Sequence, residues 1–175
     1  TKAGGKEPQS LISNIATFER TFETYDIDAK FQKEFAFKAD LVIVAIGENV
    51  PGLKTEESKH AFKASVTKLL KKLKAHSDPV ILVRTCFWAN TVKDTLLKQA
   101  CDEVGGILAD SGALSKDERN YGRSEREFTH KGVAAHPGDR GTHDLWLRLL
   151  ALGVQGADPL DLPVQRRRPL QLPGR

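Results

Sequence analysis

Three short apolar runs, separated by two amphipathic helical patterns, constrain the fold of this chain more than any other feature. The first run lies in residues 39–46, where six apolar residues follow one another, and residues 80–83 and 107–110 carry the second and third. Unbroken runs rich in β-branched residues are typical of strands that are covered on both faces, as in a parallel sheet. The order strand, helix, strand, helix, strand therefore predicts right-handed βαβ units in an α/β domain.

The two helical patterns predict which residues face the core. Residues 56–75 carry one apolar stripe at helical spacing, formed by Phe62, Val66, Leu69, Leu70 and Leu73. Residues 92–104 carry a second, formed by Val92, Leu96, Leu97, Ala100 and Val104. The two cysteines, Cys86 and Cys101, fall at apolar positions and are predicted to be buried thiols.

The two ends of the chain look different from its middle. Residues 1–10 are polar, and residues 27–37 suit a short helix or a turn. After the third strand, residues 111–140 show no periodicity, and a loop of that length is often functional. A last helix over about 142–152 precedes a tail rich in Pro and Arg, which we expect to be disordered. We therefore predict one domain over residues 1–152 and a disordered tail over 153–175.

Composition excludes several classes of protein. The net charge is +4, from 27 basic and 23 acidic residues, and no groove-reading motif or stacking platform for nucleic acid is visible. We interpret the lysines at 68, 71, 72 and 74 as a solvated helix face and the arginines at 166–168 as part of the tail. No apolar run approaches the ~18 residues that span a bilayer, and no N-terminal apolar segment suggests a signal peptide. We expect neither a nucleic-acid nor a membrane partner, while compartment and oligomeric state stay open.

Two residues are placed where a parallel sheet binds ligands, beyond the carboxyl ends of its strands. Asn49 follows the first strand after Gly47, and its side-chain NH2 could stabilise an oxyanion. His136 precedes Pro137 at a junction between a loop and a helix, a position suited to a general base. Taken alone, an asparagine at this position more often belongs to a plain turn, and a lone histidine is more often a surface residue. The spacing of His130 and His136 is unlike that of zinc sites, so we predict no metal and no cofactor.

Together, these segments resemble the SGNH (GDSL-like) hydrolases over about residues 14–141. Gly47-Glu48-Asn49 is similar to that family's third signature block, and residues 136–141, His-Pro-Gly-Asp-Arg-Gly, are similar to its fifth. Three intervening segments are similar to one branch of the family: Phe87-Trp88, residues 120–126 (Asn-Tyr-Gly-Arg-Ser-Glu-Arg) and residues 132–135 (Gly-Val-Ala-Ala).

The resemblance implies a flavodoxin-like, three-layer α/β/α sandwich and a serine esterase. In the family, a serine attacks an ester carbonyl, a histidine takes its proton, and an asparagine side chain helps to hold the oxyanion. By position, Asn49 would be that oxyanion donor and His136 that general base. The substrate would be an acyl or acetyl ester of a carbohydrate or another small polar molecule.

The chain departs from the family pattern in two places. The Gly-Asp-Ser block and the glycine of the second block are absent, and neither Ser10 nor Ser13 follows a buried strand. We therefore expect that the fold lacks its first strand and that the serine precedes Thr1. The aspartate that often orients the histidine is replaced by Val133, although Asp139 could assist.

These departures leave two hypotheses about function. The first is an esterase whose activity depends on the missing serine, so that this chain alone is inactive. The alternative is a non-catalytic α/β binding module that retains the old pocket. The hydrolase hypothesis requires Asn49 and His136 to meet across one cleft.

Overall fold

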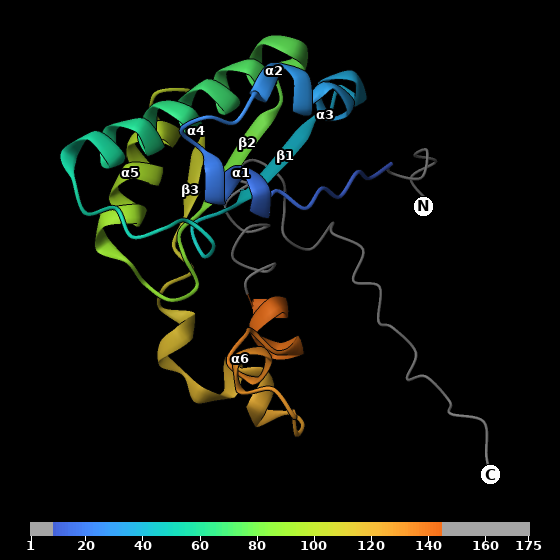
Figure 1. Ribbon diagram of the computed structural model, residues 1–175. Helices are drawn as coiled ribbons and strands as arrows, with labels where there is room; N and C mark the ends of the chain where they lie inside the picture. Colours follow the sequence, from blue (N-terminus) through green and yellow to red (C-terminus); the bar gives the residue numbers. More distant parts are fainter. Residues whose placement is uncertain (1–8, 145–175) are drawn as a thin grey trace, which may run out of the picture.

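The computed structural model describes residues 9–144, and its centre is a parallel sheet of three strands in the order β1-β2-β3 (Figure 1). The strands are β1 (Leu41–Ala45), β2 (Val80–Arg84) and β3 (Ile107–Ala109). Helix α4 (Glu56–Ser77) connects β1 to β2, and α5 (Thr91–Asp102) connects β2 to β3. The predicted α/β class and the order of these five elements are confirmed.

Short helices precede and follow this unit. Before β1 lie α1 (Ala16–Thr21), α2 (Ile27–Lys30) and α3 (Gln32–Phe37). After β3 the chain folds into short turns of helix beyond the carboxyl ends of the strands: η1 (Leu114–Lys116), η2 (Glu118–Asn120), η3 (Gly122–Ser124) and α6 (Lys131–Ala134) (Figure 1). The segment in which the sequence shows no periodicity is thus built from single helical turns, which are too short to produce a periodic pattern.

Local chemistry determines where the two long helices begin and end. A capping box joins Thr55 and Ser58 at the start of α4, and Asp78, in the left-handed conformation, ends it. Asn90 caps α5 through the N–H of Lys93. The prediction that Val92 faces the core is wrong. Val92 is 41% exposed, because it lies in the first turn of α5, away from the centre of the core.

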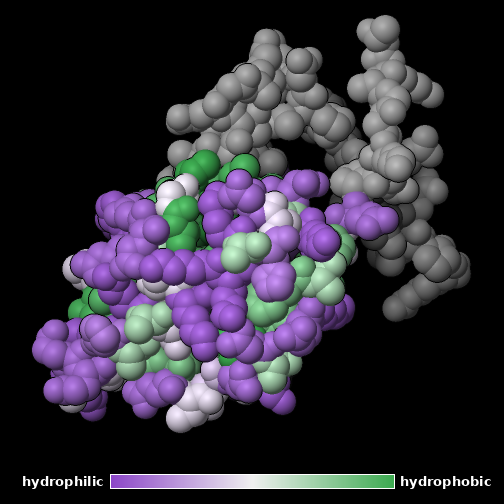
Figure 2. Space-filling model, turned by 90° about the horizontal axis from the view of Figure 1, so that it is seen from above, coloured by the Kyte–Doolittle hydropathy of each residue, from purple (hydrophilic) through white to green (hydrophobic). Residues whose placement is uncertain are grey.

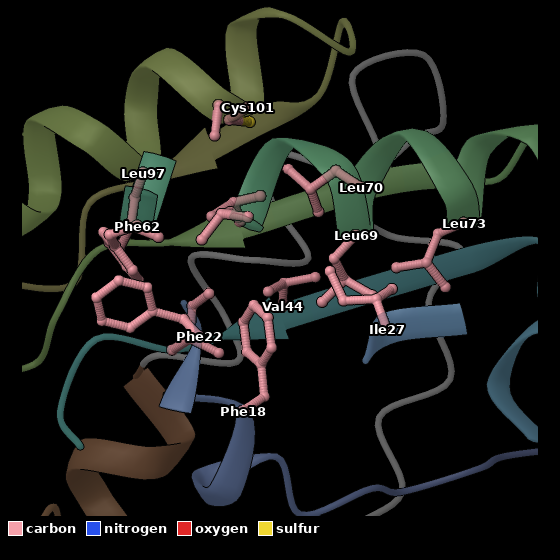
Figure 3. Packing of buried hydrophobic residues seen from close by; sticks show 14 of the residues in the cluster. Phe18, Phe22, Ile27, Val44, Phe62, Leu69, Leu70, Leu73, Leu97 and Cys101 are labelled. Carbon is pink, nitrogen blue, oxygen red and sulfur yellow. The ribbon is translucent and has the colours of Figure 1, made fainter. Parts of the chain in front are cut away.

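The main core lies between one face of the sheet and the helices. Figure 3 shows side chains of α4 converging on Val44 and on the aromatic residues Phe18 and Phe22. All five predicted core positions of α4 are buried, and so are Cys86 and Cys101. On the other face of the sheet, Leu82 and Ala109 form a small cluster with Ile43 and Ile107. The cross-strand neighbours Leu41 and Val80 are both 46% exposed there.

The outward surface of α4 is hydrophilic, as Figure 2 shows from above. Lys68 and Lys72 pair with Asp28, and Lys63 and Lys71 pair with Glu103. These exposed pairs confirm that the lysines form a solvated helix face. Within residues 9–144, no helix is both long enough and apolar enough to cross a membrane.

The last predicted helix begins earlier than expected, because residues 139–144 are already helical. Most of the predicted helix 142–152, the tail 153–175 and residues 1–8 lie outside the described residues.

Candidate functional site

The turn after β1 begins with a glycine that cannot be replaced without strain. Gly47 has φ +127°, a region that side chains with a Cβ rarely adopt. A Cβ built on Gly47 would lie 2.3 Å from Sγ of Cys86. Backbone conformation and close packing therefore both require glycine at this first position of the turn.

Asn49 is exposed, but its carboxamide is hydrogen-bonded to two side chains of α1. Its Nδ2 donates to Oε2 of Glu19 at 2.8 Å, and its Oδ1 accepts from Nη2 of Arg20 at 3.3 Å. The same Glu19 carboxylate accepts the backbone N–H of Gly47 at 2.7 Å and that of Asn49 at 3.2 Å. Glu19 is only 4% exposed, so three N–H groups satisfy a buried carboxylate. The side chain of Asn49 is thus fixed by a hydrogen-bonded polar cluster.

Sequence reasoning missed both Glu19 and Arg20. The one local signal is that Glu19 follows Phe18 and precedes Phe22 by one helical turn, on the side of α1 that faces the core. A charged residue at such a position needs a buried partner. The sequence alone does not say which residue that partner is.

Glu48, which lies between Gly47 and Asn49, connects the turn after β1 to the loop after β2. Its Oε1 accepts from Nη1 of Arg84 at 2.7 Å and from the backbone N–H of Phe87 at 2.9 Å. Burial works to raise the pKa of Glu48, but the hydrogen bond and charge of Arg84 outweigh it, and the pKa lies below its usual value. Glu48 is therefore ionised at neutral pH and keeps the loop that carries Phe87 and Trp88 in place.

The first turn of α5 adds a second connection between the same loops. Nζ of Lys93 donates to the carbonyl oxygens of Gly47 at 2.9 Å and Val50 at 2.6 Å. Asp94 accepts the backbone N–H groups of Cys86 and Asn90, each at 2.8 Å. The carboxyl ends of β1 and β2 are thus joined by side chains of α5.

The thiol of Cys86 lies within this network and is held in its protonated form. Burial, reinforced by the charge and hydrogen bond of Asp94, raises its pKa to about 12. At neutral pH the thiolate, which is the reactive form, is almost unpopulated.

His136 lies on the same edge of the sheet, beside the loop after β2. Its ring meets Trp88 edge to face, with the centroids 5.2 Å apart and an interplanar angle of 74°. Its backbone oxygen accepts the N–H of Gly122 at 2.8 Å, next to an isolated bridge between Tyr121 and Pro137. His136 is exposed, and its imidazole has no hydrogen-bond partner among residues 9–144. Only the aromatic contact with Trp88 therefore orients the ring within the described chain.

Asp139 makes no side-chain hydrogen bond to His136 among the described residues. Its backbone N–H and that of Arg140 donate to the carboxylate of Glu125 at 2.7 and 2.8 Å. These two amides are at the start of the helical segment 139–144, so Glu125 caps it across the loop. The acceptor that caps this segment thus comes from a residue distant in sequence.

The structure brings Asn49 and His136 to the same edge of the sheet, but they make no direct hydrogen bond or ring contact. The two residues are connected only indirectly. Glu48, which precedes Asn49, accepts the backbone N–H of Phe87, and the ring of Phe87 contacts that of Trp88, with centroids 5.5 Å apart. Trp88 then touches His136. Three adjacent ring contacts, including one between Phe87 and Tyr121 at 5.3 Å, hold this part of the edge together.

No serine between residues 9 and 144 hydrogen-bonds to His136. Ser111, on the same edge after β3, is fully buried and its Oγ donates to the backbone oxygen of Thr85 at 2.5 Å. Ser124 donates to the backbone oxygens of Arg119 and Tyr121. These hydroxyl groups are engaged with the backbone and none is paired with a base.

A metal site is not formed by the side chains that the structure describes. No group of three or more His, Cys, Asp or Glu residues converges within residues 9–144. Nδ1 of His130 instead accepts the backbone N–H of Gly132 at 3.1 Å, which caps α6. His130 and His136 therefore have separate surroundings.

The described groove of about 610 Å³ lies elsewhere, along the outward side of α4. Its lining includes Lys63, Thr67, Lys71 and Glu103, and it shares no residue with the edge that carries Asn49 and His136.

Comparisons of this chain with protein-family models, with curated proteins and with solved structures found no match.

Proposed function

We propose that the edge carrying Asn49 and His136 is part of the active site of an SGNH-type serine esterase. The observation that supports this proposal is that Asn49 follows β1, while Trp88, in the loop after the adjacent parallel strand β2, contacts the ring of His136. We further propose that the whole fold is the flavodoxin-like, three-layer sandwich of that family, of which the three-stranded sheet is a part.

In the proposed reaction, a serine hydroxyl attacks the carbonyl carbon of an acyl or acetyl ester. His136 takes the proton of the serine and delivers it to the leaving alkoxide, which departs as the alcohol and leaves the acyl group on the serine. Water, deprotonated by His136, then attacks this acyl ester and releases the acid and the free serine. The side-chain N–H of Asn49 stabilises the oxyanion of the tetrahedral intermediate. The alcohol part of the substrate is proposed to be a carbohydrate or another small polar molecule.

The nucleophile is proposed to come from a segment that precedes Thr1. Within residues 9–144, β1 is at one edge of the sheet and has a partner strand on one side only, so a further strand could pair there. A Gly-Asp-Ser turn after such a strand would place its serine on the edge that carries Asn49 and His136. The chain of 175 residues is then expected not to turn over esters by itself.

The test is to express the chain together with the residues encoded immediately upstream of Thr1 and to follow hydrolysis of p-nitrophenyl acetate. We expect turnover by the extended protein and none by residues 1–175. In the extended protein His136→Ala should lower kcat by about 10²–10⁴-fold, and Asn49→Ala by about 10²–10³-fold. His130→Ala is the matched control, because His130 is an exposed histidine that only caps α6. Equal loss of turnover in the two histidine variants, or turnover unaffected by His136→Ala, would contradict the proposal.

A non-catalytic α/β binding module is the second candidate. The observation that favours it is the absence, among residues 9–144, of a serine hydroxyl paired with His136. An upstream sequence without a Gly-Asp-Ser turn, and an extended protein that binds acetylated sugars without cleaving them, would establish this alternative.

A further inference from the structure

We propose that Glu19 and Arg20 are positioning residues for Asn49: they hold its carboxamide in one orientation and leave its second Nδ2 hydrogen free for a ligand oxygen. The inference rests on the proposed function, because it gives α1 the role of orienting the Asn49 side chain that is proposed to bind the oxyanion. No motif of the sequence suggested a role for either residue.

The orientation of the Asn49 amide follows from the chemistry of its two partners. Both oxygens of the Glu19 side chain accept N–H groups, so this side chain must face the NH2 group of Asn49. A guanidinium can only donate, so Arg20 must face the oxygen. The two partners are consecutive residues of α1, and a flipped amide would set donor against donor and acceptor against acceptor. A single orientation is therefore enforced at both ends of the carboxamide.

A count of hydrogens shows what remains available. The Nδ2 group of Asn49 carries two hydrogens, and one of them binds Oε2 of Glu19. No other acceptor within residues 9–144 binds Nδ2, and Asn49 is exposed. The second N–H thus points away from Glu19 and is free to bind an oxygen from outside.

The charges of the two clamping residues have opposite effects on that free N–H. The carboxylate of Glu19 alone would disfavour a second negative charge near Nδ2. Arg20 offsets this, because its guanidinium binds Oδ1 and withdraws electron density from the amide. Glu19 is also fixed by the N–H groups of Gly47 and Asn49, so the clamp is rigid before any ligand arrives. A preorganised donor of this kind is what oxyanion stabilisation requires.

The first test is spectroscopic and needs no catalytic activity. In ¹H–¹⁵N spectra of residues 1–175, the side-chain NH2 signals of Asn49 are assigned as the pair that disappears in Asn49→Asp. We expect two well-separated protons, the one bound to Glu19 lying downfield. Glu19→Gln should reduce this separation, because the glutamine oxygen can accept the backbone N–H groups of the turn only if its own NH2 group is turned towards the NH2 of Asn49. Glu23→Gln, the same change at an exposed glutamate of the next turn, should leave the pair unmoved.

Arg20 keeps the inference falsifiable if Glu19→Gln unfolds the protein. Arg20 is exposed, so Arg20→Ala is expected to fold and to shift the Asn49 signals, and Arg20→Lys to restore them in part. In the extended protein, Arg20→Ala should lower kcat about tenfold with KM unchanged, a smaller loss than that of Asn49→Ala.

The outcomes separate the two proposals. Asn49 signals that are unchanged in both Glu19→Gln and Arg20→Ala would overturn the positioning role, whatever the extended protein hydrolyses. Shifted signals together with no turnover by the extended protein would overturn the esterase function and leave the clamp standing.

Discussion

The buried carboxylate of Glu19 accepts a hydrogen bond from the exposed side-chain amide of Asn49, at 2.8 Å. This contact joins a six-residue helix near the start of the described chain to the turn that follows the first strand. Because the same carboxylate also binds two backbone N–H groups of that turn, α1 and the edge of the sheet form one polar unit. The stability of the turn and the orientation of the Asn49 amide therefore both depend on the side chain of Glu19.

Asn49→Asp should destabilise the protein at neutral pH. The substitution places a second carboxylate against Glu19, and two like charges at that distance cannot both be ionised without cost. We expect the free energy of unfolding to fall by about 1–2 kcal/mol at pH 7. Urea unfolding at pH 7 measures this, and a free energy of unfolding equal to that of the wild type would contradict it.

Gly47→Ala should be among the more damaging single substitutions in the chain. It combines a backbone conformation that alanine rarely adopts with a Cβ that would collide with Sγ of Cys86. We expect a loss of about 2–4 kcal/mol in the free energy of unfolding. Gly52→Ala is the matched control, because a Cβ on Gly52 would meet only Cε of Lys54 within 4 Å, at an ordinary contact distance of 3.9 Å, and Gly52 has no positive φ. Thermal unfolding of the two variants compares them directly, and similar melting temperatures would be inconsistent with the role given to Gly47.

Arg84→Met should weaken the link between the first two strand ends in a pH-dependent manner. In the wild type the folded-state pKa of Glu48 is lowered, so its contribution to stability is present above pH ~4.3 and is lost as the pH falls through the folded pKa. Without Arg84, burial dominates and raises the pKa of Glu48. The difference in the free energy of unfolding between the variant and the wild type should therefore shrink as the pH falls. We expect a deficit of about 2–4 kcal/mol at pH 7 that narrows towards pH 4.

Arg119→Met provides the comparison for this pair. Arg119 makes an ion pair with Asp117 at the surface, where solvent screens the charges, and its loss should change stability little. Urea unfolding of both variants across pH 4–7 is the measurement. A pH-independent deficit in Arg84→Met would show that Glu48 does not depend on Arg84 for its charge.

Both cysteines should resist modification in the folded protein. Cys86 and Cys101 are buried, and burial raises the pKa of each thiol, that of Cys86 to about 12. Ellman's reagent at pH 8 should therefore react with both thiols in urea and with neither, on a scale of minutes, in buffer. Rapid labelling of Cys86 in buffer would mean that the loop after β2 opens readily and that its ties to Glu48 and Asp94 are weak.

Periodicity and turn chemistry, which are local properties, were sufficient to predict the three strands, the two long helices and the side of α4 that is buried. They were sufficient because an unbroken apolar run and an apolar stripe at helical spacing are each visible within a single window of residues. Asn49 and His136 were predicted as site residues because each lies beside a Gly or Pro that marks a turn and because the segments around them resemble one family, and their roles stay predictions.

The partners of these residues were decided by tertiary structure alone. Glu19 and Asn49 are 30 residues apart, Glu125 reaches the amide of Arg140 over 15, and Trp88 meets His136 across two loops. A hydrogen bond or ring contact between distant segments leaves no periodic trace, because either residue would be equally acceptable at an exposed surface in another fold. Only the packing of α1 against the sheet shows that Glu19 is buried, and burial is what obliges a carboxylate to find the N–H groups that this turn supplies.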